Sequence, residues 1–228
     1  MDVNRFRQLP LMGILRDINV DAIEPIVEIV VSSGLHTIEI TMNTPEATKL
    51  IKRTTELAKN QLIIGAGTVL TMADLHSAIE AGATFVVLPT VIPEVVNHCT
   101  KNGIPVFPGA LTPQEIYNAW AADATMVKVF PSSFFGPTYF KEIKGPFRDV
   151  ELLACGGVTP GNIGEFFSCG ASAVAFGGSV FKKEWIAARE FSRIKESIRA
   201  MINGYRNQYP LINESNSSPK HKQEALHE

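Results

Sequence analysis

The chain has 228 residues, and 45% of them are hydrophobic, which is enough for one large domain with a substantial core. Its 21 basic and 23 acidic residues leave a net charge of −2, so charge gives no support for a nucleic-acid or anionic-membrane surface and favours a small-molecule partner. The first residues lack the apolar core of a signal peptide, and no apolar run reaches the roughly 18 residues that span a bilayer. We therefore expect a cytoplasmic protein.

Eight short apolar runs follow one another along the chain and predict β-strands. They begin at Leu11, His36, Leu62, Phe85, Pro105, Met126, Val150 and Ala173. Their starts lie roughly 20 to 26 residues apart, the length of one strand, one helix and two short loops. Eight such units fit a compact, single-domain (β/α)8 barrel, and a doubly wound open sheet is the main alternative.

The segments between these strands carry signals for helix starts and helix ends. Each predicted start has Thr at the N-cap and Pro at the first helical position, as in Thr44-Pro45, Thr112-Pro113 and Thr159-Pro160. Glycines that precede the next strand predict the helix ends, at Gly34, Gly82, Gly103 and Gly170. From Asn207 onward the sequence is polar and aperiodic, so we expect residues 1–206 to form the barrel and 207–228 to form a disordered tail.

A lysine lies in the middle of the sixth predicted strand, in the segment MVKVF. Alternate side chains share one face of a strand, so Lys128 faces the same way as Phe130, and Glu39 on the second predicted strand faces the same way as Thr41. If both faces point into the barrel, Lys128 and Glu39 meet there. The pair is then catalytic, or a buried ion pair, or Lys128 extends out through the barrel mouth.

Two glycine-rich turns follow the seventh and eighth predicted strands. CGGVTPGN contains Gly156 and Gly157, and FGGSVF contains Gly178 and Ser179. Exposed backbone amides at a helix start bind anions, and barrels commonly hold a phosphate in the loops after these two strands. The turns predict a phosphorylated ligand, with an ordinary tight turn as the alternative interpretation.

The segment IGAGTVL places Gly67 and Thr68 at the end of the third predicted strand. It is either a tight turn or a set of amides and a hydroxyl directed at a ligand carboxylate. It lacks the final glycine of a dinucleotide-binding motif, so no such cofactor is expected. The histidines and cysteines show no metal-ligand spacing, and we expect no metal.

Taken together, IEITMNTP, IGAGTVL, VKVFPSSFFGP, CGGVTP and FGGS, in this order and at these separations, resemble the aldolases that act on 2-keto-3-deoxy-6-phosphogluconate and its relatives. The resemblance extends from about Leu9 to Tyr205. It implies a class I, Schiff-base (β/α)8 barrel, usually a homotrimer, which cleaves its substrate to pyruvate and glyceraldehyde 3-phosphate.

By this resemblance Lys128 forms the imine and Glu39 transfers protons. Burial in an apolar barrel favours the neutral amine, which is the form that attacks a ketone. The resemblance also implies a pyruvate-carboxylate contact at Thr68 beside Gly67, pocket walls at Pro89 and Phe130, and a phosphate cradle of Gly156, Gly157, Gly178 and Ser179.

The chain departs from the gluconate-type pattern at two binding positions. Asn43 replaces an arginine found in many members, and Cys155 replaces a threonine before the Gly-Gly turn. The segments GILRDI, MNTP and FPSSFFGP look more like the branch that acts on 2-keto-3-deoxy-6-phosphogalactonate, which has an aliphatic residue where this chain has Cys155. Both C4 epimers therefore stay open, with 4-hydroxy-2-oxoglutarate as a possible side substrate.

Arg16, at the end of the first predicted strand, is the predicted replacement for the arginine missing at position 43. The alternative is that it pairs with Asp17 or Asp21 at the barrel rim. Two other functions also stay open. One is a phosphate-binding barrel isomerase or synthase in which Lys128 acts as a charge, and the other is a non-catalytic phosphosugar-binding protein.

Overall fold

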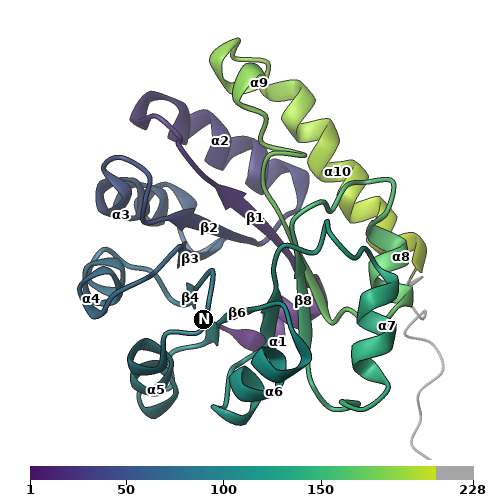
Figure 1. The fold of residues 1–228 in the computed structure, drawn as a ribbon. Coiled ribbons are helices and arrows are strands. Elements are labelled where there is room, and N and C mark those ends of the chain that lie inside the picture. The colour runs from purple at the N-terminus through teal and green to yellow at the C-terminus, as the bar shows by residue number, and fades with distance from the viewer. Residues whose placement is uncertain (209–228) are drawn as a thin grey trace, which may run out of the picture.

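Parallel strands alternate with helices along residues 1–208, the part of the chain that the computed structural model describes (Figure 1). The strands are β1 (Leu11–Leu15), β2 (Thr37–Thr41), β3 (Ile63–Gly67), β4 (Val86–Val87), β5 (Val106–Phe107), β6 (Gly109–Ala110), β7 (Val127–Val129), β8 (Leu152–Cys155) and β9 (Ala173–Phe176). The helices are α1 (Val3–Gln8), α2 (Val20–Ser33), α3 (Ala47–Ala58), α4 (Met72–Glu80), α5 (Pro93–Lys101), α6 (Pro113–Ala121), α7 (Thr138–Lys144), α8 (Ile163–Ser168), α9 (Lys183–Ala187) and α10 (Phe191–Gln208).

The strands close into a barrel, as the sequence predicts. Their order is β5-β4-β3-β2-β1-β9-β8-β7-β6. The two ends of this order, β5 and β6, are consecutive in the chain and are separated only by Pro108, whose carbonyl accepts a hydrogen bond of 2.9 Å from the Lys128 backbone N–H. The fifth predicted strand thus corresponds to β5, and β6 continues it beyond Pro108; the doubly wound sheet is excluded.

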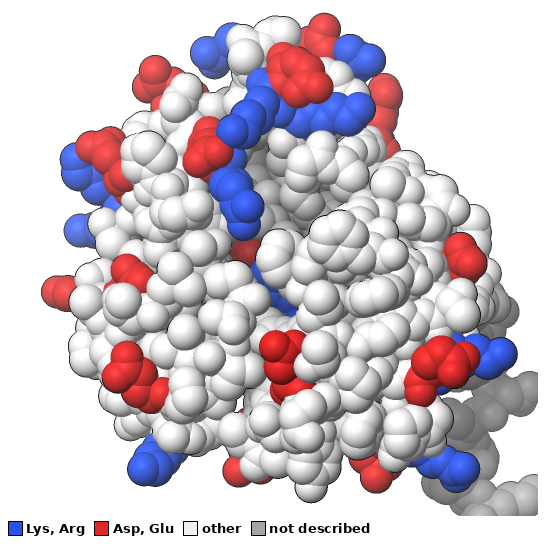
Figure 2. All heavy atoms as spheres, viewed as in Figure 1, with Lys and Arg blue, Asp and Glu red and all other residues white. Residues whose placement is uncertain are grey.

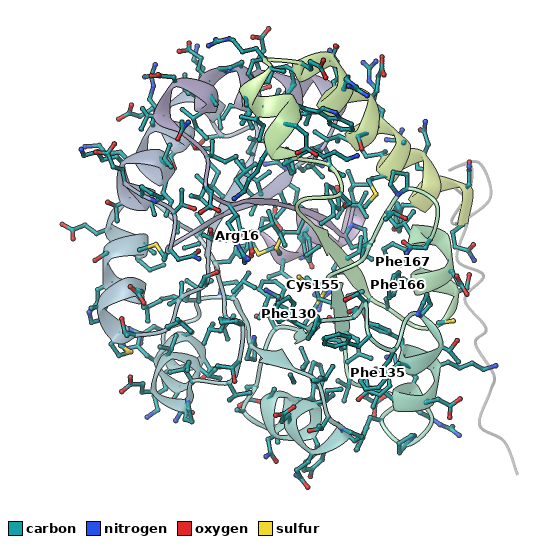
Figure 3. The ribbon with its side chains drawn as sticks, turned by 45° about the horizontal axis from the view of Figure 1, so that its top comes forward. Arg16, Phe130, Phe135, Cys155, Phe166 and Phe167 are labelled. Carbon is teal, nitrogen blue, oxygen red and sulfur yellow. The ribbon has the colours of Figure 1, made fainter. Side chains whose placement is uncertain are left out.

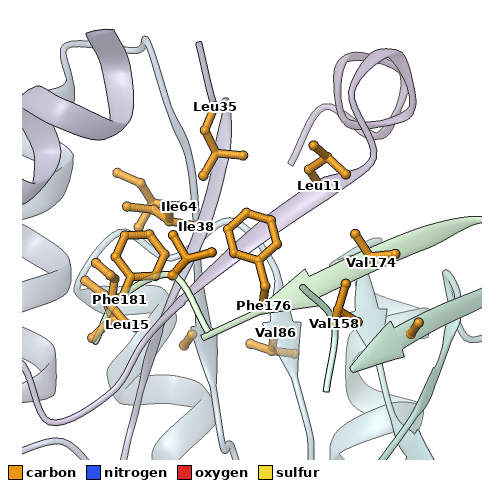
Figure 4. Packing of buried hydrophobic residues seen from close by; sticks show 14 of the residues in the cluster. Leu11, Leu15, Leu35, Ile38, Ile64, Val86, Val158, Val174, Phe176 and Phe181 are labelled. Carbon is orange, nitrogen blue, oxygen red and sulfur yellow. The ribbon is translucent and has the colours of Figure 1, made fainter. Parts of the chain in front are cut away.

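Side chains alternate between the barrel interior and the layer between strands and helices. Ile38 and Ile40 belong to the outer layer, where Figure 4 shows Ile38 near Phe181. Side chains that point the opposite way, toward the barrel axis, form a second cluster inside the barrel, to which Met126 and Leu153 belong. The polar face of β2 therefore points into the barrel, a direction that the sequence left open.

Helix α1 packs against the end of the barrel where the strands begin, a contact that was not predicted. Phe6 is fully buried in the interior cluster and meets the ring of Phe107 edge to face, with 5.9 Å between ring centroids. A packed aromatic contact at this end leaves the carboxyl ends of the strands as the place for a ligand.

The predicted helix starts are right in one case and wrong in two. Thr112 is the N-cap of α6 and forms a capping box with Glu115. In contrast, α3 begins three residues after Thr44, and α8 begins four residues after Thr159. The Thr44 hydroxyl instead forms a hydrogen bond of 2.9 Å with the Thr41 hydroxyl at the end of β2.

The carboxyl-terminal helix extends past the predicted end of the barrel domain. Helix α10 includes Asn207 and Gln208, which the prediction assigned to the tail, and the rest of that predicted tail lies outside the described residues. Within residues 1–208, no helix combines the length and apolar character needed to cross a bilayer.

Candidate active site

A cavity of about 600 Å³ lies at the carboxyl ends of β1, β7, β8 and β9. Figure 2 shows this face hollowed near its centre, with basic side chains along the upper rim of the hollow, and Figure 3 shows Arg16, Phe130 and Cys155 around the middle of the barrel. Eight predicted site residues line the cavity: Arg16, Lys128, Phe130, Cys155, Gly156, Gly157, Gly178 and Ser179.

Lys128 is buried inside the barrel with only 5% of its surface exposed. Its Nζ lies 5.1 Å from the centroid of the Phe130 ring, and the Cys155 thiol lies close enough to be influenced by its charge. No carboxylate in the described part of the chain lies within ion-pair distance of Lys128. The alternatives of a buried ion pair and of a lysine extended into solvent are therefore wrong.

Glu39 lies on β2 inside the barrel and is 1% exposed. Burial raises the pKa of its carboxyl group, and the positive charges of Lys128 and Arg16 partly oppose this shift. Its Oε2 has no hydrogen-bond partner among the described residues. Three ionisable groups, at the end of β1 and on β2 and β7, thus influence one another inside this end of the barrel.

Gly67 makes room for the Glu39 carboxylate. A Cβ placed on Gly67 would lie 2.6 Å from Glu39 Oε1, which is closer than real Cβ atoms come to other atoms. The glycine at the end of β3 therefore leaves the space that the Glu39 carboxylate on the neighbouring strand β2 occupies.

The raised pKa of Glu39 predicts a pH-dependent effect on stability. The folded protein keeps this proton at a pH where the unfolded chain has lost it, so the contribution of Glu39 to the unfolding free energy falls as pH rises from about 4.5 through the raised pKa. We expect the unfolding free energy of Glu39→Gln, relative to wild type, to increase over that window in urea titrations. A difference that stays constant with pH contradicts this account.

Ser132 joins the end of β7 to the end of β8, a role that the sequence did not reveal. Its buried hydroxyl donates to the Val129 carbonyl at 2.7 Å and accepts from the Cys155 N–H at 3.1 Å. Its own N–H donates to the Cys155 carbonyl at 2.8 Å. These bonds fix the Gly-Gly turn relative to the strand that carries Lys128.

Ser132→Ala is expected to lower the unfolding free energy by about 1–3 kcal/mol, because two buried backbone groups lose their partner. Ser133 is exposed, so Ser133→Ala serves as the control and is expected to change stability by less than about 0.5 kcal/mol. Denaturant titrations of both variants measure the difference. Equal stabilities of the two variants would contradict a structural role for the Ser132 hydroxyl.

The two glycine turns have the geometry of tight turns and also line the cavity. Gly156 and Gly157 have φ values of +94° and +77°, which side chains disfavour. Gly178 has open space around it, with nothing within 4 Å of an added Cβ. The Ser179 hydroxyl, however, donates to the Val158 carbonyl at 2.7 Å and so links the two turns.

Five predicted site residues are not part of the cavity lining. Glu39 and Gly67 contact each other on the β2–β3 side of the barrel, as described above. Thr68 follows β3 with a left-handed φ of +55°, Asn43 is exposed in the loop after β2, and the carbonyl of Pro89 packs against Gly109.

Arg16 does not pair with the rim carboxylates that were its alternative partners. Asp17 forms an ion pair of 2.7 Å with Lys183 instead, and no ion pair of Arg16 occurs among residues 1–208. Arg16 lines the cavity, and its charge lowers the pKa of Glu39 against the effect of burial.

Comparison with known proteins shows the family. The family described as "KDPG and KHG aldolase" matches residues 3–197. The "2-dehydro-3-deoxy-6-phosphogalactonate aldolase" of Escherichia coli K12 is 32% identical over 200 residues, which cover 87% of this chain and 96% of that protein.

Two solved structures extend the comparison. The one described as "Native KDPGal structure" has a TM-score of 0.82 and 31% identity, and the match covers 88% of this chain and 96% of that one. The KDPG aldolase from Legionella pneumophila, with "pyruvate captured at low pH as a covalent carbinolamine intermediate", has a TM-score of 0.78 and 27% identity over 84% of this chain and 93% of that one.

The parallel barrel and these relatives define an enzyme of the lyase class, an aldolase. Within that class, the chain belongs to the KDPG and KHG aldolase family.

Proposed function

We propose that this enzyme cleaves a 2-keto-3-deoxy-6-phospho sugar acid to pyruvate and glyceraldehyde 3-phosphate through an imine at Lys128. The observation that carries the proposal is the position of Lys128: its amine is buried at the cavity, and it has no carboxylate partner among the described residues. An amine in such surroundings is available as a nucleophile rather than held as a structural ion.

The chemistry begins when Lys128 Nζ attacks the C2 ketone and the resulting carbinolamine loses water to form an iminium ion. A base removes the proton of the C4 hydroxyl, the C3–C4 bond breaks, and its electron pair moves into an enamine. The aldehyde leaves, the enamine takes a proton at C3, and water releases pyruvate. Glu39 is the group proposed for these proton transfers, since it lies inside the same barrel as Lys128 and burial raises its pKa above the usual value of a carboxyl group.

The relatives support this proposal without deciding between the epimers. The E. coli relative is named for the galactonate epimer, and the Legionella structure is a KDPG aldolase that holds pyruvate covalently. We propose that the chain cleaves one or both epimers, with 4-hydroxy-2-oxoglutarate as a side substrate. Comparing kcat/KM for the two purified epimers answers this question directly.

Reductive trapping tests the imine. Pyruvate with borohydride is expected to add mass at Lys128, located by peptide mass spectrometry. Lys144 is the internal control, because desolvation lowers its pKa but its amine donates to the carbonyls of Arg148 and Val150 at 3.0 and 2.7 Å. If Lys128 stays unmodified and the protein turns over a phosphosugar, the result favours an isomerase or synthase. If Lys128 stays unmodified and no turnover is seen, it favours a phosphosugar-binding protein.

Arg16→Ala is expected to weaken pyruvate binding and imine formation by about 2 to 3 kcal/mol, the scale of a hydrogen bond to a charged group. The reason is that a pyruvate carboxylate in a largely desolvated pocket needs a cation, and Asn43 supplies none. The pyruvate concentration that gives half-maximal trapping measures the effect. If the variant traps pyruvate as well as wild type does, Thr68 and the amides near Gly67 must bind the carboxylate.

We also propose that the enzyme is a homotrimer, as the family resemblance implies, and that it works in the cytoplasm. An exposed aromatic surface beside α7 is the proposed contact region: Phe134 and Phe135 are 76% and 58% exposed, and Figure 3 shows Phe135 away from the barrel centre. Sedimentation equilibrium measures the mass of the assembly. A monomer or a dimer in that measurement would contradict the trimer.

A further inference from the structure

Lys182 lines the active-site cavity, and no sequence motif points to a role for it. It stands between β9 and α9 and is half-buried. Its Nζ lies 4.5 Å from the centroid of the Trp185 ring, a cation–π contact that limits where the amine can be. Among residues 1–208, no carboxylate forms an ion pair with it.

The neighbouring lysine is in a different situation. Lys183 also lines the cavity, but its amine forms a 2.7 Å ion pair with Asp17, and its side chain is 74% exposed. Lys182 and Lys183 thus offer the same charge at adjacent positions, one without a carboxylate partner and one with its charge already balanced.

The glycine turns alone are a weak site for a phosphate dianion. They supply backbone N–H groups, while the Ser179 hydroxyl already donates its hydrogen bond to the Val158 carbonyl. Binding a doubly charged group away from water requires charge-assisted hydrogen bonds. Lys182 lines the same cavity as Gly157 and Gly178 and carries the charge that the turns lack.

Trp185 is suited to position this lysine. Arg193 of α10 also lies over the Trp185 ring, 4.8 Å from its centroid, but it pairs with Glu190 at 2.7 Å. The ring therefore attracts two cations, and only Lys182 among them lines the cavity and lacks a carboxylate partner within the described chain.

We propose that Lys182, held over Trp185, is the cation of the phosphate subsite and binds the phosphate of the aldehyde half of the substrate. The inference rests on the proposed aldolase function for the identity of that substrate. In this arrangement the turns after β8 and β9 direct amides at the phosphate, and Lys182 supplies its charge. Trp185 is a positioning residue that acts through Lys182.

The experiment compares Lys182→Gln with Lys183→Gln in the full chain, because the two variants have the same net charge and adjacent positions. The probe is 3-phosphoglycerate, titrated calorimetrically at constant ionic strength. For Lys182→Gln we expect binding to weaken by about 10- to 100-fold, the effect of losing a hydrogen bond to a charged group, and for Lys183→Gln by less than about twofold. Lys182→Arg is expected to restore most of the affinity.

A second measurement separates this subsite from the catalytic lysine. Trapping of pyruvate by borohydride is expected to be the same in Lys182→Gln and wild type, because pyruvate has no phosphate. Trp185→Leu is expected to weaken binding of the probe less than Lys182→Gln does. Added to Lys182→Gln, it is expected to cause no further loss of affinity.

Two outcomes would overturn the assignment of Lys182. One is that Lys182→Gln binds the probe as tightly as wild type does. The other is that both glutamine variants lose the same affinity for the probe, which would mean that the positive charge of the cavity rim attracts the phosphate without a specific contact. Failure of the proposed function is distinguishable from both. If the wild-type protein does not trap pyruvate, but Lys182→Gln and not Lys183→Gln loses affinity for 3-phosphoglycerate, the proposed aldolase reaction is wrong and the proposed phosphate subsite is supported.

Discussion

Lys128→Ala is expected to reduce turnover to less than about a hundredth of the wild-type value while the protein remains folded, because an imine cannot form without the amine. The fold is expected to survive since the substitution removes a buried charge that forms no ion pair in the described chain. Release of pyruvate, followed with a coupled reductase, gives turnover, and denaturant titration gives stability. Turnover above that limit in a folded variant counts against imine catalysis.

Lys128→Arg separates the covalent role from a purely electrostatic one. Arginine keeps the positive charge near Glu39 and Cys155 but is not a nucleophile for a ketone. The imine mechanism predicts that this variant is as inactive as Lys128→Ala. An isomerase or synthase that uses Lys128 only as a charge would retain part of its activity with arginine.

The barrel and the meeting of charged groups inside it could be predicted because they follow from periodicity. Each of the eight predicted apolar runs overlaps a strand, and the alternation along β2 and β7 places Glu39 and Lys128 on one face of each strand. In a closed parallel barrel, residues of the same parity share one small volume, whatever loops connect their strands. Local pattern therefore predicted the strands and the residues that share a face, while closure of the barrel and the inward direction of the polar faces needed the structure.

Features that depend on contacts between distant segments were not predictable in this way. The hydroxyl of Thr44 bonds to Thr41 at the end of β2 and does not cap α3, because tertiary contacts outweigh the local preference for an N-cap. The bonds of Ser132 depend on how the ends of β7 and β8 meet. Lys182 and Lys183 are adjacent and chemically alike in the sequence, and only the packing of Trp185 and Asp17 distinguishes them.

Glu39→Gln is expected to lower kcat by about 10²- to 10⁴-fold, the range for losing a general acid–base group. Glutamine keeps nearly the same shape but cannot exchange protons, so the fold and the Lys128 amine stay in place. The matching readout is exchange of the pyruvate methyl protons with deuterium, which is expected to slow by a similar factor. Unchanged exchange in this variant would remove Glu39 from proton transfer.

Gly67→Ala tests the same role through position instead of chemistry, because the new Cβ would lie 2.6 Å from Glu39 Oε1 and must displace the carboxylate. Gly161→Ala is the control for adding a methyl group, since its Cβ would meet the Thr159 hydroxyl only at 3.8 Å. If proton transfer requires Glu39 at its observed place, Gly67→Ala slows methyl-proton exchange about as much as Glu39→Gln does. The double variant Gly67→Ala with Glu39→Gln then loses little more than either single variant, because both changes remove one and the same carboxylate from the reaction. Losses that multiply in the double variant would mean that Gly67 and Glu39 serve different steps.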